Sequence, residues 1–116
     1  MKRKIIFWGT YFHDFYYQQD IKVKKRIDFV LDIVRYTDKI PGKFFKFLTG
    51  TDGIFEIKVE TTFKGIRMLS FFDEGNLVLV INCFSKKTRK TPKNEIELAE
   101  KLKNEYFEYK KRRIKK

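Results

Sequence analysis

The order of apolar and polar residues divides the first part of the chain into a strand and two helices. Residues 5–8 form a short apolar run that predicts a strand, and the aromatic-rich residues 11–19 predict a short helix. Asp20 then stands where an N-cap is expected, before apolar residues that recur every three or four positions. These are Val23, Ile27, Val30, Leu31 and Val34. Their spacing predicts a helix with one apolar face.

The middle of the chain changes to a period of two, which is typical of strands. Residues 55–60 alternate between apolar and charged side chains, which predicts a strand with one solvated, charged face. Residues 65–72 predict a second strand, and the turn residues 73–76 lead into a third at 77–84. Because residues 77–84 are apolar on both faces, we expect this strand in the middle of a sheet.

Two further segments flank these strands. Residues 43–48 alternate basic and aromatic residues and predict a short turn or helix. Pro92 stands where a helix can begin, and Ala99, Leu102, Tyr106 and Tyr109 fall on one face of that helix. We therefore expect Tyr106 and Tyr109 to serve in packing.

The order of elements predicts an α+β fold with helices packed on an antiparallel sheet. A chain of 116 residues suits one domain, which we place at residues 1–111, with a basic tail at 112–116. The 42% share of hydrophobic residues is enough for a packed core. The apolar run near the N-terminus is too short for a signal peptide or a membrane span, so we expect a cytoplasmic protein.

The charge of the chain points to a polyanionic partner. A formal net charge of +12 on 116 residues favours nucleic acid as the partner ahead of a membrane surface. Cys83 is the single cysteine, so no internal disulfide can form, and its apolar surroundings predict a buried, inert thiol. No histidine–cysteine or carboxylate cluster has metal-ligand spacing, and no phosphate loop is present. We expect neither a metal nor another cofactor.

Three segments resemble the central strands of toxins of the RelE/ParE superfamily. They are residues 53–59, residues 65–67 and residues 72–76. The basic segment 84–92, Phe-Ser-Lys-Lys-Thr-Arg-Lys-Thr-Pro, resembles the HigB-like branch in particular. The first half of the chain matches by the order of its elements. The resemblance implies a RelE-like fold and a toxin of a type II toxin–antitoxin system.

The resemblance also implies a target and a partner. Such toxins act on messenger RNA at the ribosome, and a separate antitoxin neutralises them, here expected to be a helix-turn-helix protein similar to HigA. RNA can be cut without metal when its 2′-hydroxyl attacks the neighbouring phosphorus. The protein then supplies a base, an acid and positive charge on the phosphoryl oxygens. Lysine and arginine side chains can fill these roles.

Arg67 matches the arginine of the superfamily's Tyr-Arg strand, and a guanidinium fork suits two phosphoryl oxygens. The alternative is a strand arginine that pairs across the sheet with Glu56 or Glu60. Lys58 replaces an arginine that the family often has, which keeps the charge and loses the fork. Glu56 is a supporting residue, either as partner of the base or as a charge pair that orients Lys58 or Arg67.

The basic segment supplies the other expected site residues. We assign catalysis to Lys86 and Lys87 together with Arg67, and RNA binding to Arg89, Lys90 and Lys93 in addition to Lys58. Crowded like charges favour the neutral form of an amine, so one of these lysines is the expected base. The alternative is a solvated basic loop that holds RNA without chemistry.

One departure from the family bears on the chemistry. Relatives often place a tyrosine or histidine near the start of the last helix, and residues 91–95 contain neither. His13 lies in the first helical region, where we expect a structural role. The leading hypothesis is thus a ribosome-dependent endoribonuclease that works with lysine and arginine. The alternatives are a ParE-like toxin that inhibits gyrase without cutting RNA, and a non-enzymatic nucleic-acid-binding protein.

Overall fold

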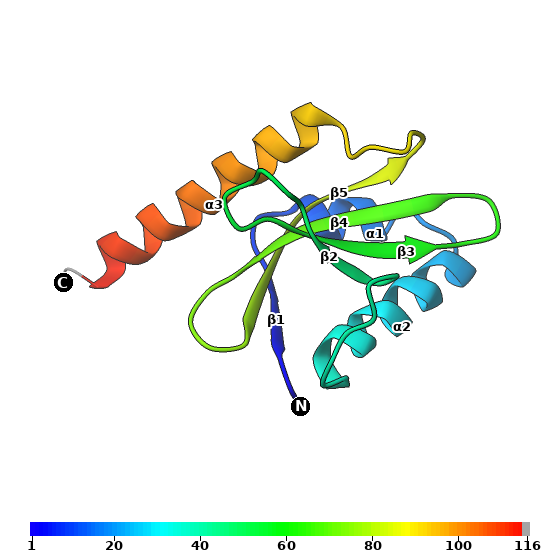
Figure 1. Cartoon of the computed structure of the whole chain (residues 1–116), viewed down its shortest axis with the longest axis horizontal. Helices are drawn as coiled ribbons and strands as arrows, with labels where there is room; N and C mark the ends of the chain where they lie inside the picture. Colours follow the sequence, from blue (N-terminus) through cyan, green and yellow to red (C-terminus); the bar gives the residue numbers. More distant parts are fainter. Residues whose placement is uncertain (115–116) are drawn as a thin grey trace.

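The structure, a computed structural model, describes residues 1–114 and has an α+β fold, as predicted. The helices are α1 (Tyr11–Tyr16), α2 (Ile21–Tyr36) and α3 (Lys93–Ile114). The strands are β1 (Lys4–Phe7), β2 (Phe45–Phe47), β3 (Phe55–Glu60), β4 (Gly65–Phe72) and β5 (Leu77–Lys86). The five strands form one sheet, which lies between α2 and α3 (Figure 1).

The sheet has the order β1-β5-β4-β3-β2. Neighbours from β2 to β5 are antiparallel, whereas β1 runs parallel to β5. The predicted antiparallel sheet is therefore correct for four strands and wrong for β1. Short hairpin links force antiparallel pairing, but β1 and β5 are joined by a long crossover that leaves the direction open. β5 lies between β1 and β4, which confirms the prediction of an inner strand.

Each face of the sheet carries its own hydrophobic cluster. Val78 and Val80 of β5 join the cluster that contains the buried residues of α2, and Leu79 and Ile81 join the cluster beneath α3. The five apolar positions predicted for α2 are all buried. The Asp20 carboxylate accepts a hydrogen bond from the backbone N–H of Val23 at 2.9 Å, which confirms the N-cap.

A bulge in β5 anchors the start of α3. The register between β4 and β5 shifts by one residue beyond Met68, so Ile81 and Asn82 both lie opposite Leu69. Asn82 is buried, and its Nδ2 donates to the backbone carbonyl of Glu95 at 3.0 Å and to the Glu95 carboxylate at 2.9 Å. The first turn of α3 is thereby fixed against the sheet.

The structure also differs from the sequence prediction in β2, α1 and α3. Residues 45–47 form strand β2 and not a turn or helix, because Phe45 pairs with Ile57 and stacks on Phe55 at 5.0 Å. α1 ends at Tyr16, earlier than expected. α3 continues to Ile114, so it includes the start of the expected tail, while residues 115–116 lie outside the described part.

No helix within residues 1–114 has the length and apolar character needed to cross a membrane.

A candidate nucleic-acid interface

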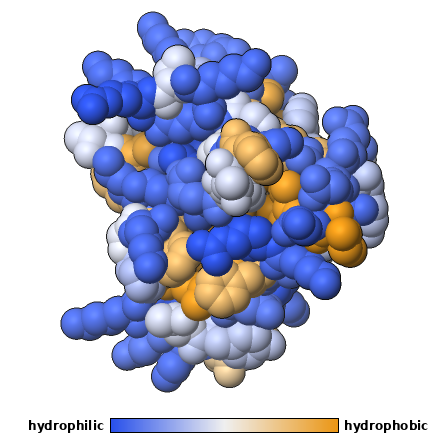
Figure 2. Space-filling model, turned by 90° about the vertical axis from the view of Figure 1, so that its right-hand side faces the viewer, coloured by the Kyte–Doolittle hydropathy of each residue, from blue (hydrophilic) through white to orange (hydrophobic). Residues whose placement is uncertain are grey.

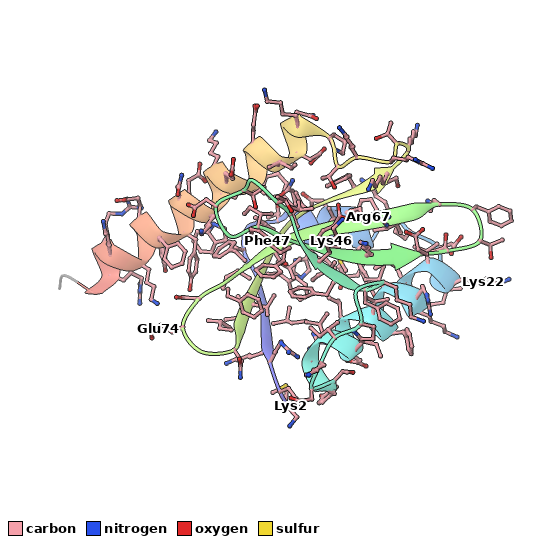
Figure 3. The ribbon with its side chains drawn as sticks, in the orientation of Figure 1. Lys2, Lys22, Lys46, Phe47, Arg67 and Glu74 are labelled. Carbon is pink, nitrogen blue, oxygen red and sulfur yellow. The ribbon has the colours of Figure 1, made fainter. Side chains whose placement is uncertain are left out.

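A basic groove lies on the side of the sheet that faces α3. It has a volume of about 580 Å³. Its strand residues are Lys46 of β2, Glu56 and Lys58 of β3, Arg67 of β4 and Lys86 of β5. Arg89, Lys90 and Thr91 of the β5–α3 loop, together with Leu48, Thr49 and Ile96, complete the lining. Figure 3 labels Lys46 and Arg67, which come from two strands of the same sheet. We call this surface the basic groove.

The alternation of β3 and the pairing of the strands explain why these side chains meet. Ile57 and Val59 belong to the α2-side cluster, so Glu56 and Lys58, which alternate with them, lie on the opposite face. Lys58 is the register partner of Arg67, and Lys46 is the partner of Glu56. Residues opposite each other on adjacent strands place their side chains on the same face. Glu56 and Lys58 of β3 therefore become part of the groove.

Arg67 is both a groove residue and an ion-pair residue. Its guanidinium is largely buried, and Nη1 lies 2.7 Å from Oε1 of Glu60. Nη1 also donates to the backbone carbonyl of Ile66 at 3.1 Å, and Nε lies 3.6 Å from Oε1 of Glu56. Nε has no hydrogen-bond partner among residues 1–114. The cross-strand pairing expected as an alternative for Arg67 is thus present at the edge of the groove.

Glu56 is 2% exposed, so the prediction that the charged face of β3 is solvated is wrong at this residue. The hydroxyl of Thr91 donates to its Oε2, and its Oε1 faces Arg67. The β5–α3 loop therefore covers Glu56. A carboxylate so deeply buried needs such partners to offset the loss of hydration. Glu56 therefore contacts both Arg67 of β4 and the basic loop.

The basic segment divides into residues that line the groove and residues that do not. Lys86, Arg89 and Lys90 line it, with Lys86 half-buried at the end of β5. Lys87 is exposed and is not part of the lining. Lys93 lies on the first turn of α3, where its Nζ is 3.9 Å from Glu97. Six of the eight expected site residues thus meet at the groove, and Lys87 and Lys93 lie outside it.

Among the groove residues that were not anticipated from the sequence, Lys46 and Thr91 bear most on the chemistry. Lys46 lies on β2, and the only signal for it is the Phe-Lys-Phe alternation of residues 45–47. Thr91 precedes Pro92 at the end of the basic segment, and its contact with Glu56 joins residues 35 positions apart. Neither position carries a pattern that separates it from an ordinary loop residue.

The lining of the groove combines six basic side chains with one carboxylate. Clustered positive charge in a concave surface attracts polyanions and raises their local concentration. The side of the molecule with the β3–β4 hairpin is shown in Figure 2, where hydrophilic side chains cover most of the face. The arrangement is suited to binding a phosphate backbone.

Other residues with reactive side chains lie elsewhere. His13 is exposed and surrounded by Phe7, Phe12 and Tyr17, whose ring centroids lie 5.6, 5.7 and 6.2 Å from that of His13. Burial raises the pKa of the Cys83 thiol, which keeps it protonated. Within residues 1–114, no group of three or more histidine, cysteine and carboxylate side chains is placed to hold a metal ion.

Tyr106 and Tyr109 pack, as expected, rather than line the groove. Both rings contact Trp8, with centroids 5.2 Å away in each case. The hydroxyl of Tyr106 donates to Asp73 at 2.5 Å. Burial, followed by this hydrogen bond, raises the pKa of Tyr106 to about 12. The late part of α3 is therefore a structural element.

Comparison with known proteins identifies the family. The family model described as "Phage derived protein Gp49-like (DUF891)" matches residues 14–104, which include α2, β2 to β5 and all residues of the groove. No curated protein matches the chain. The match covers more than half of the 116 residues. The chain therefore belongs to the Gp49-like family of RelE-like toxins, whose place in toxin–antitoxin systems implies an antitoxin as partner.

Proposed function

We propose that this toxin is a HigB-like, metal-independent endoribonuclease that cleaves messenger RNA on the ribosome. The observation that carries the proposal is the basic groove, in which Arg67 and five further cations surround one buried carboxylate. The messenger RNA backbone supplies a matching row of phosphates. Placement on the ribosome would position one phosphodiester over Arg67.

The cleavage follows from the chemistry of RNA. The 2′-oxygen attacks the adjacent phosphorus, and the bond from phosphorus to the 5′-oxygen breaks. A base accepts the proton of the 2′-hydroxyl, and an acid donates a proton to the departing 5′-oxygen. The products are a 2′,3′-cyclic phosphate and a 5′-hydroxyl. Cations around the phosphate stabilise the charge that builds up on its non-bridging oxygens.

The geometry favours particular residues for these roles. Arg67 and its register partner Lys58 would hold the non-bridging oxygens. Lys86 is the better candidate for proton transfer, because it lines the groove, whereas Lys87 does not. Arg89 and Lys90 would bind the flanking phosphates, and Lys87 and Lys93 would contact RNA farther from the reacting bond. Glu56 holds Arg67 and the loop in position.

The partners are part of the proposal. We infer that a helix-turn-helix antitoxin similar to HigA neutralises this toxin in the cytoplasm, where translating ribosomes are found. Expression of the toxin alone should arrest growth. Co-expression of a helix-turn-helix protein from a neighbouring reading frame should restore it. The two proteins should then copurify.

The test is cleavage of a message in a reconstituted translation reaction. Wild-type protein should cut the translated message, and Arg67→Ala should cut about 100-fold more slowly, the loss typical of removing one transition-state contact. Arg35→Ala is the matched control, because Arg35 pairs with Asp32 at 3.0 Å and does not line the groove. Equal rates for wild type and Arg67→Ala would contradict the assignment of the site.

Expression of the protein in cells, together with RNA binding in vitro, separates the alternatives. A ParE-like gyrase inhibitor would leave messages intact, and it would damage DNA and arrest growth. A non-enzymatic nucleic-acid-binding protein would bind RNA with strong salt dependence and would cause neither cleavage nor arrest.

A further inference from the structure

Arg67 has two carboxylate neighbours that differ in their freedom to move. The Glu60 side chain is 58% exposed, although its Oε1 lies 2.7 Å from Nη1 of the largely buried Arg67. The Glu56 side chain is 3% exposed and is held by Thr91. Glu56 is therefore fixed in the groove. Glu60 can turn toward solvent more readily than Glu56, because its own carboxylate is already exposed to water.

Gly65 provides the space in which Glu60 meets Arg67. It is the register partner of Glu60, and a Cβ atom at Gly65 would lie 3.0 Å from Oε2 of Glu60 and 3.4 Å from Nη1 of Arg67. The backbone of Gly65 does not have a positive φ, so the conformation of this residue does not require glycine. The ion pair thus packs directly against the strand backbone, at a place that a side chain would crowd.

A second surface with basic residues is available to Glu60 when it leaves Arg67, and this surface also includes Asp20, whose carboxylate caps α2 through the N–H of Val23. Together with Lys22, Arg26 and residues of the β3–β4 hairpin, Glu60 lines a cleft of about 390 Å³. Nε of Arg26 already donates to the backbone carbonyl of Glu60 at 3.2 Å. The displaced carboxylate would therefore stay close to positive charge while the guanidinium of Arg67 is released.

We propose that Glu60 is a positioning residue: it holds Arg67 in the free protein, an RNA phosphodiester displaces it, and its carboxylate sets how tightly the groove binds RNA. This inference rests on the proposed function, in which Arg67 binds the reacting phosphate. Two anions compete for the same edge of one guanidinium, so the resident carboxylate lowers the affinity for the incoming phosphate. Removing the charge of Glu60 should strengthen RNA binding.

The test measures binding of a fully 2′-O-methylated RNA oligonucleotide, which cannot be cleaved, by fluorescence anisotropy. Glu60→Gln keeps the shape and one acceptor oxygen, and should bind about fivefold more tightly than wild type, because one partner of the ion pair is exposed and its interaction is partly screened by water. Glu108→Gln is the matched control. The Glu108 side chain is 63% exposed and lies 3.8 Å from Lys111 on α3, so the variant changes the net charge equally.

A double variant shows whether Glu60 acts through Arg67. In the Arg67→Ala background, or Arg67→Gln if the alanine variant does not fold, adding Glu60→Gln should leave the affinity unchanged. If Glu60→Gln gains no more than Glu108→Gln, or keeps its gain without Arg67, the inference about Glu60 is wrong. If the Arg67 variant alone binds RNA as wild type does, the proposed function of the groove is wrong.

Discussion

At the residue scale, the buried pair of Arg67 and Glu56 connects the sheet to the basic loop. Glu56 faces Arg67 on one side and accepts a hydrogen bond from Thr91 on the other. Removing one partner of a buried charge is costly, because the remaining charge loses both its hydration and its counter-ion. This arrangement gives Thr91 a role in positioning the lysines and arginines of the loop.

Replacing Thr91 with valine should therefore reduce cleavage with little change in KM. The variant keeps the size of the side chain and removes the hydroxyl that holds Glu56, and displacement of catalytic groups costs roughly tenfold to hundredfold in rate. Steady-state cleavage rates would measure it. Thr88→Val is the control, because the Thr88 hydroxyl donates only within the loop, to the carbonyl of Lys90 at 2.8 Å. A loss no greater than that of Thr88→Val would contradict this role.

At the element scale, α3 is anchored to the sheet near both of its ends. Asn82 holds the first turn through Glu95. Toward the C-terminus, Tyr106 and Lys110 donate to the Asp73 carboxylate at 2.5 and 2.9 Å, beside the turn between β4 and β5. The loop that carries the groove cations lies directly before the first anchor. The position of that loop therefore depends on how α3 packs against the sheet.

The Asp73 anchor should make stability depend on pH. Burial acts to raise the pKa of Asp73, but the hydrogen bonds from Tyr106, Lys110 and the backbone N–H of Glu74 outweigh it and lower the pKa. A carboxyl whose pKa is lowered by folding stabilises the protein above its unfolded pKa, about 3.9, and loses this effect as the pH falls through the folded pKa.

Asp73→Asn should thus be less stable than wild type at pH 7, by about 2 kcal/mol, and the difference should shrink below about pH 4. Denaturant unfolding at pH 7, 5 and 3 would measure the free energy of unfolding. The exposed Asp38 offers a control, since Asp38→Asn should change it little. A difference between wild type and Asp73→Asn that stays constant with pH would rule out this anchor as an ionised contact.

The elements differ in how far the sequence predicts them. α2 and β5 were predictable because their apolar residues repeat with the period of a helix or continue over both faces of a strand. β2 was not, because three residues are too few to show a period and its stability depends on Phe55 and Ile57 across the sheet. The direction of β1 could not be predicted either, since it depends on pairing with β5, which is distant in the sequence.

The residues of the candidate site likewise differ in how far the sequence predicts them. The family motif indicated Arg67, Lys86, Arg89 and Lys90, and these residues meet at the groove. The choice between partners was open: only the folded chain shows that Glu60 pairs with Arg67 and that Thr91 covers Glu56. Lys46 was missed together with its strand. Contacts between distant residues leave no local pattern in a single sequence.

At the scale of the whole molecule, the chain has a net charge of +12, and six of its cations line the basic groove. Binding of single-stranded RNA releases about 0.7 counterion for each phosphate contacted. Four to six contacts would give a slope of roughly −3 to −4 for the logarithm of affinity against the logarithm of salt concentration.

Changing Lys86 and Lys90 together to glutamine should make this slope shallower by about 1.4, because two phosphate contacts are lost. Anisotropy titrations with the 2′-O-methylated RNA over a range of KCl concentrations would measure it. Lys101→Gln alters an exposed lysine of α3 outside the groove and should leave the slope nearly unchanged. An unaltered slope in the double variant would place the RNA on another surface.

The most direct measurement is the chemistry of the RNA ends in cells that express the toxin. Cleavage by the 2′-hydroxyl predicts new 5′-hydroxyl ends and 2′,3′-cyclic phosphate ends within translated messages. Arg67→Ala should lack these ends at the same protein level. Messages that stay intact during growth arrest, or fragments that carry 5′-phosphate and 3′-hydroxyl ends, would contradict the proposed metal-free nuclease.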